Sequence, residues 1–385
     1  MIYLDNAATS WPKAPGVAAA MTAAVEQAAG NPGRGAHRLA LAAGRTVERT
    51  RLGLAQLLGV KDPSRVVFTA NTTTALNLAL KGLIRGGDHV VTTSMEHNSV
   101  TRPLHALAQR LGVRVDKAPA GPDGRVRAAD MIALIKPTTR LVVMTHASNV
   151  CGALQPVAEV GAACRRLGVP LLVDAAQTVG TFPVLVEELG ADLLAFPGHK
   201  GLLGPTGTGG LYIAPGIDLA TSIEGGTGTV SESPEQPSQC PDRYEAGTVN
   251  VVGLAGLGAA VEYLAARGLA DLRQHEQALA DRLRRGIAAM DGVSLVGPQP
   301  DAAVEDAPVV SAVVTGRDSG EVALVLDRKY DIAVRSGLHC SPDAHRTLGT
   351  LESGTIRFSI GPFNTADEID AVLAALRNIA AGETI

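Results

Sequence analysis

The sequence predicts an α/β protein with a mostly parallel sheet and a second, smaller α/β domain. Between residues 65 and 212, short apolar runs alternate with longer amphipathic segments, which is typical of repeated β–α–β units. Most of the short runs are continuously apolar, as in strands covered by helices on both faces. The length of 385 residues allows two or three domains and a large buried core.

Individual segments can be assigned to both parts of the chain. The expected strands are 66–69, 89–92, 113–115, 141–145, 171–173 and 193–196, and the expected helices are one starting near Thr73, 101–111, 128–135 and 157–167. Residues 223–242, rich in Gly, Ser, Thr, Pro and Glu, are expected to form a long functional loop. A helical stretch over 251–290, broken near Gly268, precedes strand and helix signals at 309–314, 321–327, 332–334, 355–359 and 366–379. These later signals predict the smaller domain.

The composition excludes several classes of function. A formal net charge of −4 gives no basic surface for nucleic acid. The sequence has neither a signal peptide pattern nor an apolar run near the roughly 18 residues of a membrane helix, so we expect no membrane association. The four cysteines are widely spaced without a CxxC pair, which predicts no disulfide framework and no metal site, and favours the reducing cytoplasm.

Polar residues follow several of the expected strands, where ligands bind in open α/β sheets. Thr72 and Thr73 lie where a strand gives way to a helix, and such residues either form an anion-binding cup or cap the helix. Asp174 leaves a buried strand, and an aspartate there can pair with a protonated ring nitrogen, hold a metal or cap a helix. His97 can stack on an aromatic ring or relay protons, although a lone histidine is more often structural.

Lys200 lies among glycines just after the last of these strands. The chain has only 7 lysines against 27 arginines, so a lysine in such a loop is a candidate for chemistry as well as for an ordinary exposed residue. A desolvated lysine loses its proton more readily and can act as a nucleophile. Together the four segments match pyridoxal phosphate (PLP), which needs a Schiff-base lysine, an acidic partner, a phosphate cup and a group over its ring.

Motifs along nearly the whole chain carry a family resemblance. They are YLDNAAT (3–9), NTTTALN (71–77), EHNS (96–99), SNVCG (148–152), VDAAQ (173–177), GHK (198–200), YEAGTVN (244–250), RSGLHC (335–340) and IRFS (356–359). With these motifs the chain resembles fold-type I, class V aminotransferases, and among them the Suf-type (second) group of cysteine desulfurases and selenocysteine lyases. The resemblance implies a large PLP-binding domain (16–250) with a seven-stranded sheet, and a small domain (1–15 and 251–385).

The resemblance also implies roles for individual residues around the cofactor. Lys200 is the expected Schiff-base lysine and moves the proton of the substrate Cα, while Asp174 holds the pyridine nitrogen and His97 stacks on the ring. The remaining cofactor contacts are expected from Thr72, Thr73, Asn149, Gln177 and His199. Thr248 is expected to reach the phosphate in the neighbouring subunit's site, which implies a homodimer with shared active sites.

Substrate binding and sulfur transfer are expected at the C-terminal motifs. Arg357 suits a bidentate grip on the substrate carboxylate, with Asn149 and Arg335 nearby. Cys340 lies near His339 and Arg335 in a short loop expected to lead into a helix, where a thiol can be held partly as thiolate. The implied reaction converts L-cysteine to L-alanine, leaves a persulfide on Cys340, and passes the sulfur to an acceptor protein or a small thiol.

Three positions depart from the family pattern. Pro197 replaces a hydroxyl residue two positions before the His-Lys pair, which implies the loss of one phosphate hydrogen bond. Gly33 replaces the first histidine of an early Asn-X-His-Arg-Gly segment, and residues 341–350 are unlike those of the best-known members. These changes leave the expected cofactor site in place and leave open the sulfur acceptor and the preferred substrate.

Alternative functions remain at this point. Within PLP chemistry, they are selenocysteine lyase, cysteine or cystine C–S lyase, and a true aminotransferase. A catalytically weak sulfur carrier is disfavoured, because a protein that only binds a partner would not need Lys200, Asp174 and Arg357 together. A nucleotide-binding protein is suggested only by the glycine-rich stretch 204–210, which more simply begins a strand and lacks a phosphate-binding lysine.

Overall fold

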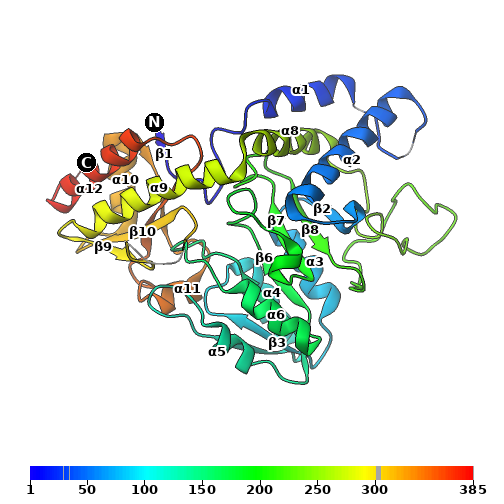
Figure 1. The fold of residues 1–385 in the computed structure, drawn as a ribbon, viewed down its shortest axis with the longest axis horizontal. Coiled ribbons are helices and arrows are strands. Elements are labelled where there is room, and N and C mark those ends of the chain that lie inside the picture. Colours follow the sequence, from blue (N-terminus) through cyan, green and yellow to red (C-terminus); the bar gives the residue numbers. More distant parts are fainter. Residues whose placement is uncertain (29, 34, 301–304, 385) are drawn as a thin grey trace.

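The computed structural model describes residues 1–28, 30–33, 35–300 and 305–384. Figure 1 shows a larger unit around a central sheet and a smaller unit formed mainly by the C-terminal part of the chain. Both ends of the chain lie on the smaller unit, since the Met1 amino group pairs with Asp331 and Glu383 pairs with Lys329.

The larger unit contains a seven-stranded sheet with the order β2-β8-β7-β6-β5-β3-β4. Its strands are β2 (Val66–Thr69), β3 (His89–Thr93), β4 (Arg114–Ala118), β5 (Thr139–Thr145), β6 (Leu171–Asp174), β7 (Leu193–Pro197) and β8 (Gly209–Ile213). The pairs among β3 to β7 are parallel, and β8 runs antiparallel to both of its neighbours. The prediction of a mostly parallel, seven-stranded sheet is therefore confirmed.

Both faces of the sheet are buried, which explains the continuous apolar runs in the sequence. Alternate residues of one strand enter different core clusters, as Val142 and Met144 do on one face and Leu141 and Val143 on the other. The first face is covered by α1 (Val17–Gln27), α2 (Arg38–Leu58), α5 (Ala128–Ala133), α6 (Val157–Leu167), α7 (Val186–Leu189) and α8 (Val251–Arg267). The second face is covered by α3 (Thr72–Leu83) and α4 (Asn98–Leu111).

The smaller unit has its own antiparallel sheet and its own core. Its strand order is β12 (Arg335–Gly337), β13 (Thr355–Ser359), β10 (Val309–Val314) and β9 (Val293–Val296). A separate parallel pair joins β1 (Ile2–Tyr3) to β11 (Ile332–Ala333), so the N-terminus is held in this unit. The core also contains residues of α9 (Leu269–Ala288), α10 (Ser319–Tyr330) and α12 (Ala366–Ala380), and the short α11 (Pro342–Thr347) follows β12.

The helical stretch 251–290 changes direction where the sequence indicated. It forms α8 and α9, which meet at Gly268 with a bend of 85°. Helix α8 packs on α1 and α2 and shares the larger core, whereas α9 packs on α12, β9 and β10. We therefore propose that the domain boundary lies at Gly268, rather than at the predicted residue 250.

Most predicted elements appear, with differences at their ends. Strand β4 begins later and runs further than the expected 113–115, and α10 is longer than the expected 321–327. Residues 223–242 contain no helix or strand, as predicted for the long loop, and 204–210 lead into β8. The sequence analysis did not assign α1, α2, α7 or β9, and it did not place β8 in the sheet.

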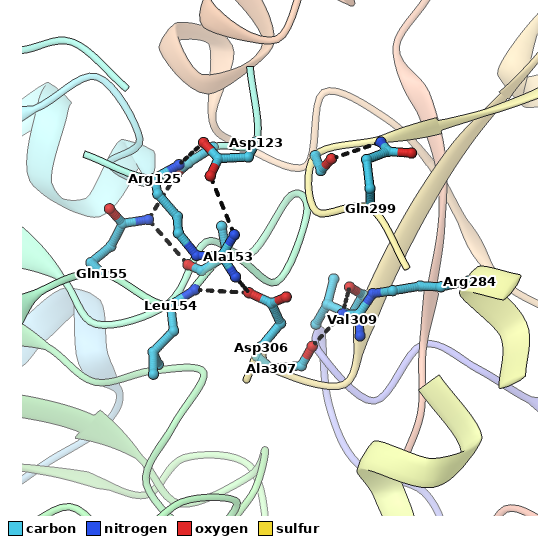
Figure 2. Close-up of polar contacts among 12 residues, drawn as sticks. Asp123, Arg125, Ala153, Leu154, Gln155, Arg284, Gln299, Asp306, Ala307 and Val309 are labelled. Atoms are coloured by element: carbon cyan, nitrogen blue, oxygen red, sulfur yellow. Dashed lines mark hydrogen bonds and ion pairs between the residues drawn. The ribbon is translucent and has the colours of Figure 1, made fainter. Parts of the chain in front are cut away.

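A polar network joins the two units beside β10 (Figure 2). Arg125 of the larger unit forms an ion pair with Asp306, whose carboxylate also accepts a hydrogen bond from the backbone N–H of Leu154. Nearby, the buried guanidinium of Arg284 donates to the carbonyl oxygens of Ala307 and Val309. The contacts of Asp306 with Arg125 and Leu154 join the two units, and those of Arg284 fix the start of β10 within the smaller unit.

A search for membrane-spanning helices among the described residues finds no single helix of sufficient length and apolar character. The bent pair α8 and α9 passes the same test when both helices are taken together, by length and composition alone.

Candidate active site

The strand ends of the larger sheet and one edge of the smaller sheet surround a cavity of about 210 Å³. It is lined by Ala7, Ala8, Asn71, Thr72, Thr73, His97, Ser99, Thr145, Ala147, Asn149, Asp174, Ala176, Gln177, His199, Lys200, Arg335, His339 and Arg357. Every site residue predicted from the sequence lines this cavity except Cys340 and Thr248. The two units therefore build one site together.

Lys200 and Asp174 form the charged centre of the cavity. Lys200 follows β7, and burial lowers the pKa of its amine to about 8, with Asp174 opposing that shift. Asp174 ends β6 and is 3% exposed, and burial raises the pKa of its carboxyl. Its Oδ1 accepts a hydrogen bond of 3.0 Å from the backbone N–H of Ala176, so the other oxygen is available to a ring nitrogen.

The predicted phosphate cup lies at the start of α3. The helix is capped by Asn71, whose side chain accepts from the backbone N–H of Thr74 at 2.9 Å, so the capping alternative for Thr72 and Thr73 is wrong. Thr73 Oγ1 lies 2.8 Å from Ser99 Oγ, while Thr72 Oγ1 is buried without a hydrogen-bond partner among the described residues. A buried hydroxyl at a helix N-terminus fits an anionic group such as the PLP phosphate.

His199 adds a second group without a partner to this side of the cavity. Its Nδ1 is buried and makes no hydrogen bond within the described part of the chain, while burial lowers the pKa of the ring to about 4. The neutral ring can donate one hydrogen bond to a phosphate oxygen. With Thr72, it shows that the residues present fit a bound phosphate.

His97 has the properties expected of a group that lies over a ring. It caps α4, and its Nδ1 accepts from the backbone N–H of Ser99 at 3.0 Å, which fixes the orientation of the imidazole. Burial, followed by the charge of Lys200, lowers the pKa of His97 to about 4. The imidazole is therefore neutral near pH 7 and can face a cofactor ring without charge repulsion from Lys200.

Two arginines from adjacent strands face the substrate side of the cavity. Arg335 of β12 and Arg357 of β13 are directly paired across the sheet, so their guanidinium groups share one region. Arg357 is 1% exposed and donates to Asp5 Oδ1 at 2.8 Å and to the carbonyl oxygen of Asn149 at 3.0 Å. Its Nε has no partner among the described residues, which leaves a donor for a carboxylate.

Asn149 has a structural function that the sequence did not indicate. Its Nδ2 donates to the carbonyl oxygen of His339 at 2.7 Å, and its Oδ1 accepts from Ser341 Oγ at 2.7 Å. Both contacts are on the loop that carries Cys340. The amide of Asn149 thus orients the cysteine loop, and its expected contact with the cofactor or substrate stays a prediction.

Gln177 lines the same cavity, with its amide oriented by the N-terminal segment. Its Nε2 donates to the carbonyl oxygen of Ala7 at 3.2 Å. The side-chain oxygen of Gln177 remains available to a ligand, as expected for a contact with the cofactor.

Cys340 lies at the mouth of the site rather than inside it. Its side chain is exposed, and both His339 and Cys340 adopt positive φ values, of 47° and 59°. The thiol Sγ is 3.7 Å from Arg335 Nη2, while the backbone carbonyl accepts from the N–H of Asn98 at 2.8 Å. As predicted, the loop leads into a helix, but α11 begins at Pro342, so the thiol precedes the helix and Arg335 is its cationic neighbour.

Thr248 lies away from the cavity of its own chain. Its side chain is exposed and accepts a hydrogen bond of 3.3 Å from Asn31 Nδ2. Because the prediction concerned the partner's site, the position of Thr248 within one chain leaves it untested. Of the departures from the family pattern, Pro197 ends β7 and Gly33 adopts a positive φ of 77°.

Sequence reasoning gave no role to Asp5 or Glu96, and it considered His339 only as a neighbour of Cys340. Asp5 pairs with Arg357, and His339 lines the cavity with a buried Nδ1 that lacks a partner in the described part of the structure. Glu96 is fully buried beneath β3, where its Oε1 accepts from Thr93 Oγ1 and from the backbone N–H of Thr145. Asp5 and Glu96 occur in motifs quoted above, but their roles depend on contacts with residues distant in sequence.

No group of three or more His, Cys, Asp and Glu side chains is arranged for a metal ion within the described residues.

Comparison with known proteins identifies the family. The model of the class V aminotransferases matches residues 2–372. A probable cysteine desulfurase from Methanothermobacter thermautotrophicus is 37% identical over 390 residues, which cover 98% of this chain and 94% of that protein. The chain belongs to the class V aminotransferase family, whose members depend on PLP.

Solved structures agree with this assignment. An apo cysteine desulfurase from Thermococcus onnurineus NA1 matches with a TM-score of 0.92 and 34% identity, over 99% of this chain and 95% of that one. The cysteine desulfurase CsdA from Escherichia coli, in its S-sulfonic acid form, matches with a TM-score of 0.89 and 29% identity, over 100% and 95% of the two chains. The predicted fold-type I architecture is thereby confirmed.

Proposed function

We propose that the protein is a PLP-dependent cysteine desulfurase that converts L-cysteine to L-alanine and receives the sulfur on Cys340. The observation that carries the proposal is the exposed Cys340 thiol, 3.7 Å from Arg335, at the mouth of a cavity that contains Lys200 and Asp174. An ordinary aminotransferase has no use for a thiol at this position. The names of the curated relatives and of the similar structures support the same activity.

In this proposal PLP is held by residues that the cavity already brings together. Thr72, Thr73 and His199 hold the phosphate, Asp174 holds the pyridine nitrogen, and His97 covers the ring. Gln177 and Asn149 contact the ring oxygen or the substrate side of the cofactor. When bound, PLP supplies an electron sink that stabilises negative charge at the substrate Cα.

Arg357 and Arg335 bind the substrate carboxylate, because two guanidinium groups on adjacent strands attract an anion more strongly than one. The lowered pKa of Lys200, about 8, lets a useful fraction of its amine be neutral near pH 7 to 8. Lys200 Nζ then takes the proton from Cα. Burial around this amine excludes water that would compete for the proton.

Sulfur transfer follows at Cys340. Its thiolate attacks the sulfur of the bound cysteine, so an S–S bond forms as the C–S bond breaks and the bonding electrons pass to the substrate carbon. The substrate Cβ takes up a proton, which balances the one that Cys340 lost on becoming a thiolate, and Lys200 returns to Cα the proton that it removed. Alanine leaves, and Cys340 carries the sulfur as a persulfide. Arg335 Nη2 lies 3.7 Å from the attacking Sγ.

The decisive experiment supplies L-cysteine and a reductant and measures alanine, pyruvate and sulfide. Wild-type protein should form alanine, and Cys340→Ala should lose this activity while keeping the cofactor absorbance. Cys164→Ala is a matched control, because that thiol is buried and far from the cavity lining. Pyruvate formation that survives Cys340→Ala would identify a C–S lyase instead. A parallel assay with L-selenocysteine tests the selenocysteine lyase alternative.

The proposal extends to a homodimer with shared sites and to the Suf-type group. Thr248 lies outside its own chain's cavity, which suits a residue that reaches the partner's phosphate. Light scattering should give the mass of two chains, and Thr248→Val should weaken PLP binding without changing that mass. A monomer with full activity would overturn this part of the proposal.

The sulfur acceptor is a protein or a small thiol, since the persulfide on an exposed Cys340 is accessible to both. The thiol must stay reduced to act, which is why we assign the protein to the reducing cytoplasm.

A further inference from the structure

A second, smaller cavity lies beside Lys200. Its volume is about 30 Å³, and it shares Ala7, Gln177 and Lys200 with the larger cavity. The hydroxyls of Thr181 and Ser359 are among its polar lining. A cavity of this volume holds a water molecule, which needs about 10–15 Å³ and two to four polar partners.

The cavity also contains a carboxyl group with no evident role. Glu276, on α9, is 6% exposed and has neither a hydrogen-bond nor an ion-pair partner among the described residues. A carboxylate buried without a partner is costly, so such a group takes up a proton instead. Burial accordingly raises the pKa of Glu276 to about 8.

Other charged groups near Glu276 are engaged elsewhere. On α9 itself, Arg273 lies over the Phe182 ring and pairs with Glu305, and the ring of His275 bonds to the carbonyl oxygen of Asn364. Arg284 donates to backbone carbonyl oxygens at the start of β10.

The N-terminal segment packed against the site adds two more charged groups. Asp5 pairs with Arg357, and Lys13 donates to the His199 carbonyl oxygen. Within the described lining of the small cavity, Lys200 and Glu276 are the two titratable groups.

We propose that Glu276 acts through Lys200 as a positioning residue. Its carboxyl group exchanges a proton with Lys200 Nζ through a water molecule in the small cavity. An N–H bond of the Lys200 ammonium breaks as its proton passes to the water. Where Glu276 is ionised, which its pKa of about 8 allows near pH 8, the water gives a proton to its carboxylate, which becomes a neutral carboxyl. The reverse transfer returns the proton, so no other reactant is needed.

The chemistry of the two groups supports this exchange. Lys200 and Glu276 both have a pKa of about 8, so moving a proton between them is close to balanced in free energy. The inference rests on the proposed function, because the proton that exchanges is the one that Lys200 takes from the substrate and later returns to Cα. Glu276 touches no reacting atom and therefore acts through Lys200.

The first test reads the protonation of Glu276 without turnover. In the infrared spectrum of the holoenzyme, wild-type protein should show the carbonyl band of a neutral carboxyl that disappears as the pH rises through about 8. Glu276→Gln should lose the part of this band that belongs to Glu276 and keep the part that belongs to Glu96, whose pKa is also raised to about 8, and Glu276→Asp should show a stronger titrating band than Glu276→Gln. A band of equal intensity in wild type and Glu276→Gln would overturn the proposal. If Glu276→Gln does not fold, a Glu96→Gln protein that loses no carboxyl band near pH 8 overturns it equally.

The second test follows the proton itself. With L-cysteine deuterated at Cα in ordinary water, wild-type enzyme should lose most of the label from the alanine it forms, because Lys200 exchanges its deuteron through Glu276. Glu276→Gln should retain several-fold more deuterium, and Glu276→Asp should return toward the wild-type level. Equal retention in wild type and Glu276→Gln would contradict the exchange. Wild-type protein that forms no alanine refutes the proposed function instead, and the infrared titration then decides the state of Glu276 alone.

Discussion

The two ends of the active site differ in their exposure to solvent. At one end, Lys200 follows a strand of the larger sheet and faces the buried Asp174, with its pKa lowered to about 8 by burial. At the other end, Cys340 is exposed on a loop of the smaller unit, with Arg335 beside its thiol. Proton chemistry at a carbon benefits from exclusion of water, whereas delivery of sulfur to another molecule requires access.

One residue connects these two ends mechanically. The backbone carbonyl of Asn149 binds Arg357, while its side chain holds the backbone of His339 and the hydroxyl of Ser341 on either side of Cys340. The exposed thiol is thus positioned by a buried amide that also lines the cavity. The two ends can therefore be perturbed separately or together by single substitutions.

The largest effect is expected at the lysine end. Lys200→Ala removes the group that takes the Cα proton, so alanine formation should fall by about 10⁴-fold, the upper range for a general base. The absorbance of the bound cofactor should change as well, whereas Cys340→Ala should leave that absorbance unchanged. The measurement is a visible spectrum and an alanine assay on both variants. A Lys200→Ala protein with the wild-type spectrum would show that another lysine holds the cofactor.

A smaller effect is expected where the two ends are joined. Asn149→Ala removes the hydrogen bonds to His339 and Ser341, so the Cys340 loop loses its orientation. A displacement of about 1 Å can cost roughly 100-fold in rate, and we expect alanine formation to fall by about that factor. Asn149→Asp keeps the acceptor for Ser341 and should lose less. Both variants should still bind PLP, and equal activities in Asn149→Ala and wild type would disprove the link.

The two ends also differ in how far the sequence predicted them. The positions of Lys200, Asp174 and Thr72 follow from local signals, because each lies just after a strand whose apolar pattern is unmistakable. The smaller unit is held by pairings between distant segments, such as β1 with β11 and Arg335 with Arg357. No local pattern encodes such register, so the links of Asn149 and Asp5 emerged only from the structure.

The contact between the units provides a third prediction. Asp306→Asn removes the ion pair with Arg125 while preserving the shape of the side chain, and should lower stability by about 1–3 kcal/mol. The loss is read from the midpoint of urea unfolding. Arg282→Gln, which breaks an exposed ion pair with Asp370, is the control and should leave the midpoint nearly unchanged. A larger change in the control than in Asp306→Asn would show that this contact does not hold the units together.

The smallest effect at neutral pH is expected at Glu96, beneath the lysine end. Burial raises the pKa of this carboxyl from 4.5 to about 8 in the folded protein. Between these values the folded state binds more protons than the unfolded state, so the free energy of unfolding falls as the pH rises from about 5 to 8. Glu96→Gln cannot ionise, and its melting temperature should decline less over this interval than that of wild type.

Burial also raises the pKa of Glu276, so the melting temperature of the Glu96→Gln variant should still decline in part between pH 5 and 8. In the double variant, Glu96→Gln with Glu276→Gln, the melting temperature should decline still less over this pH interval. Lys200 acts in the opposite sense, because its pKa is lowered from 10.5 to about 8 and it adds stability as the pH rises between those values. A Glu96→Gln melting profile parallel to wild type from pH 5 to 8 would mean that Glu96 is already ionised in the folded protein. The buried Glu96 side chain would then carry a negative charge, although burial favours its neutral form.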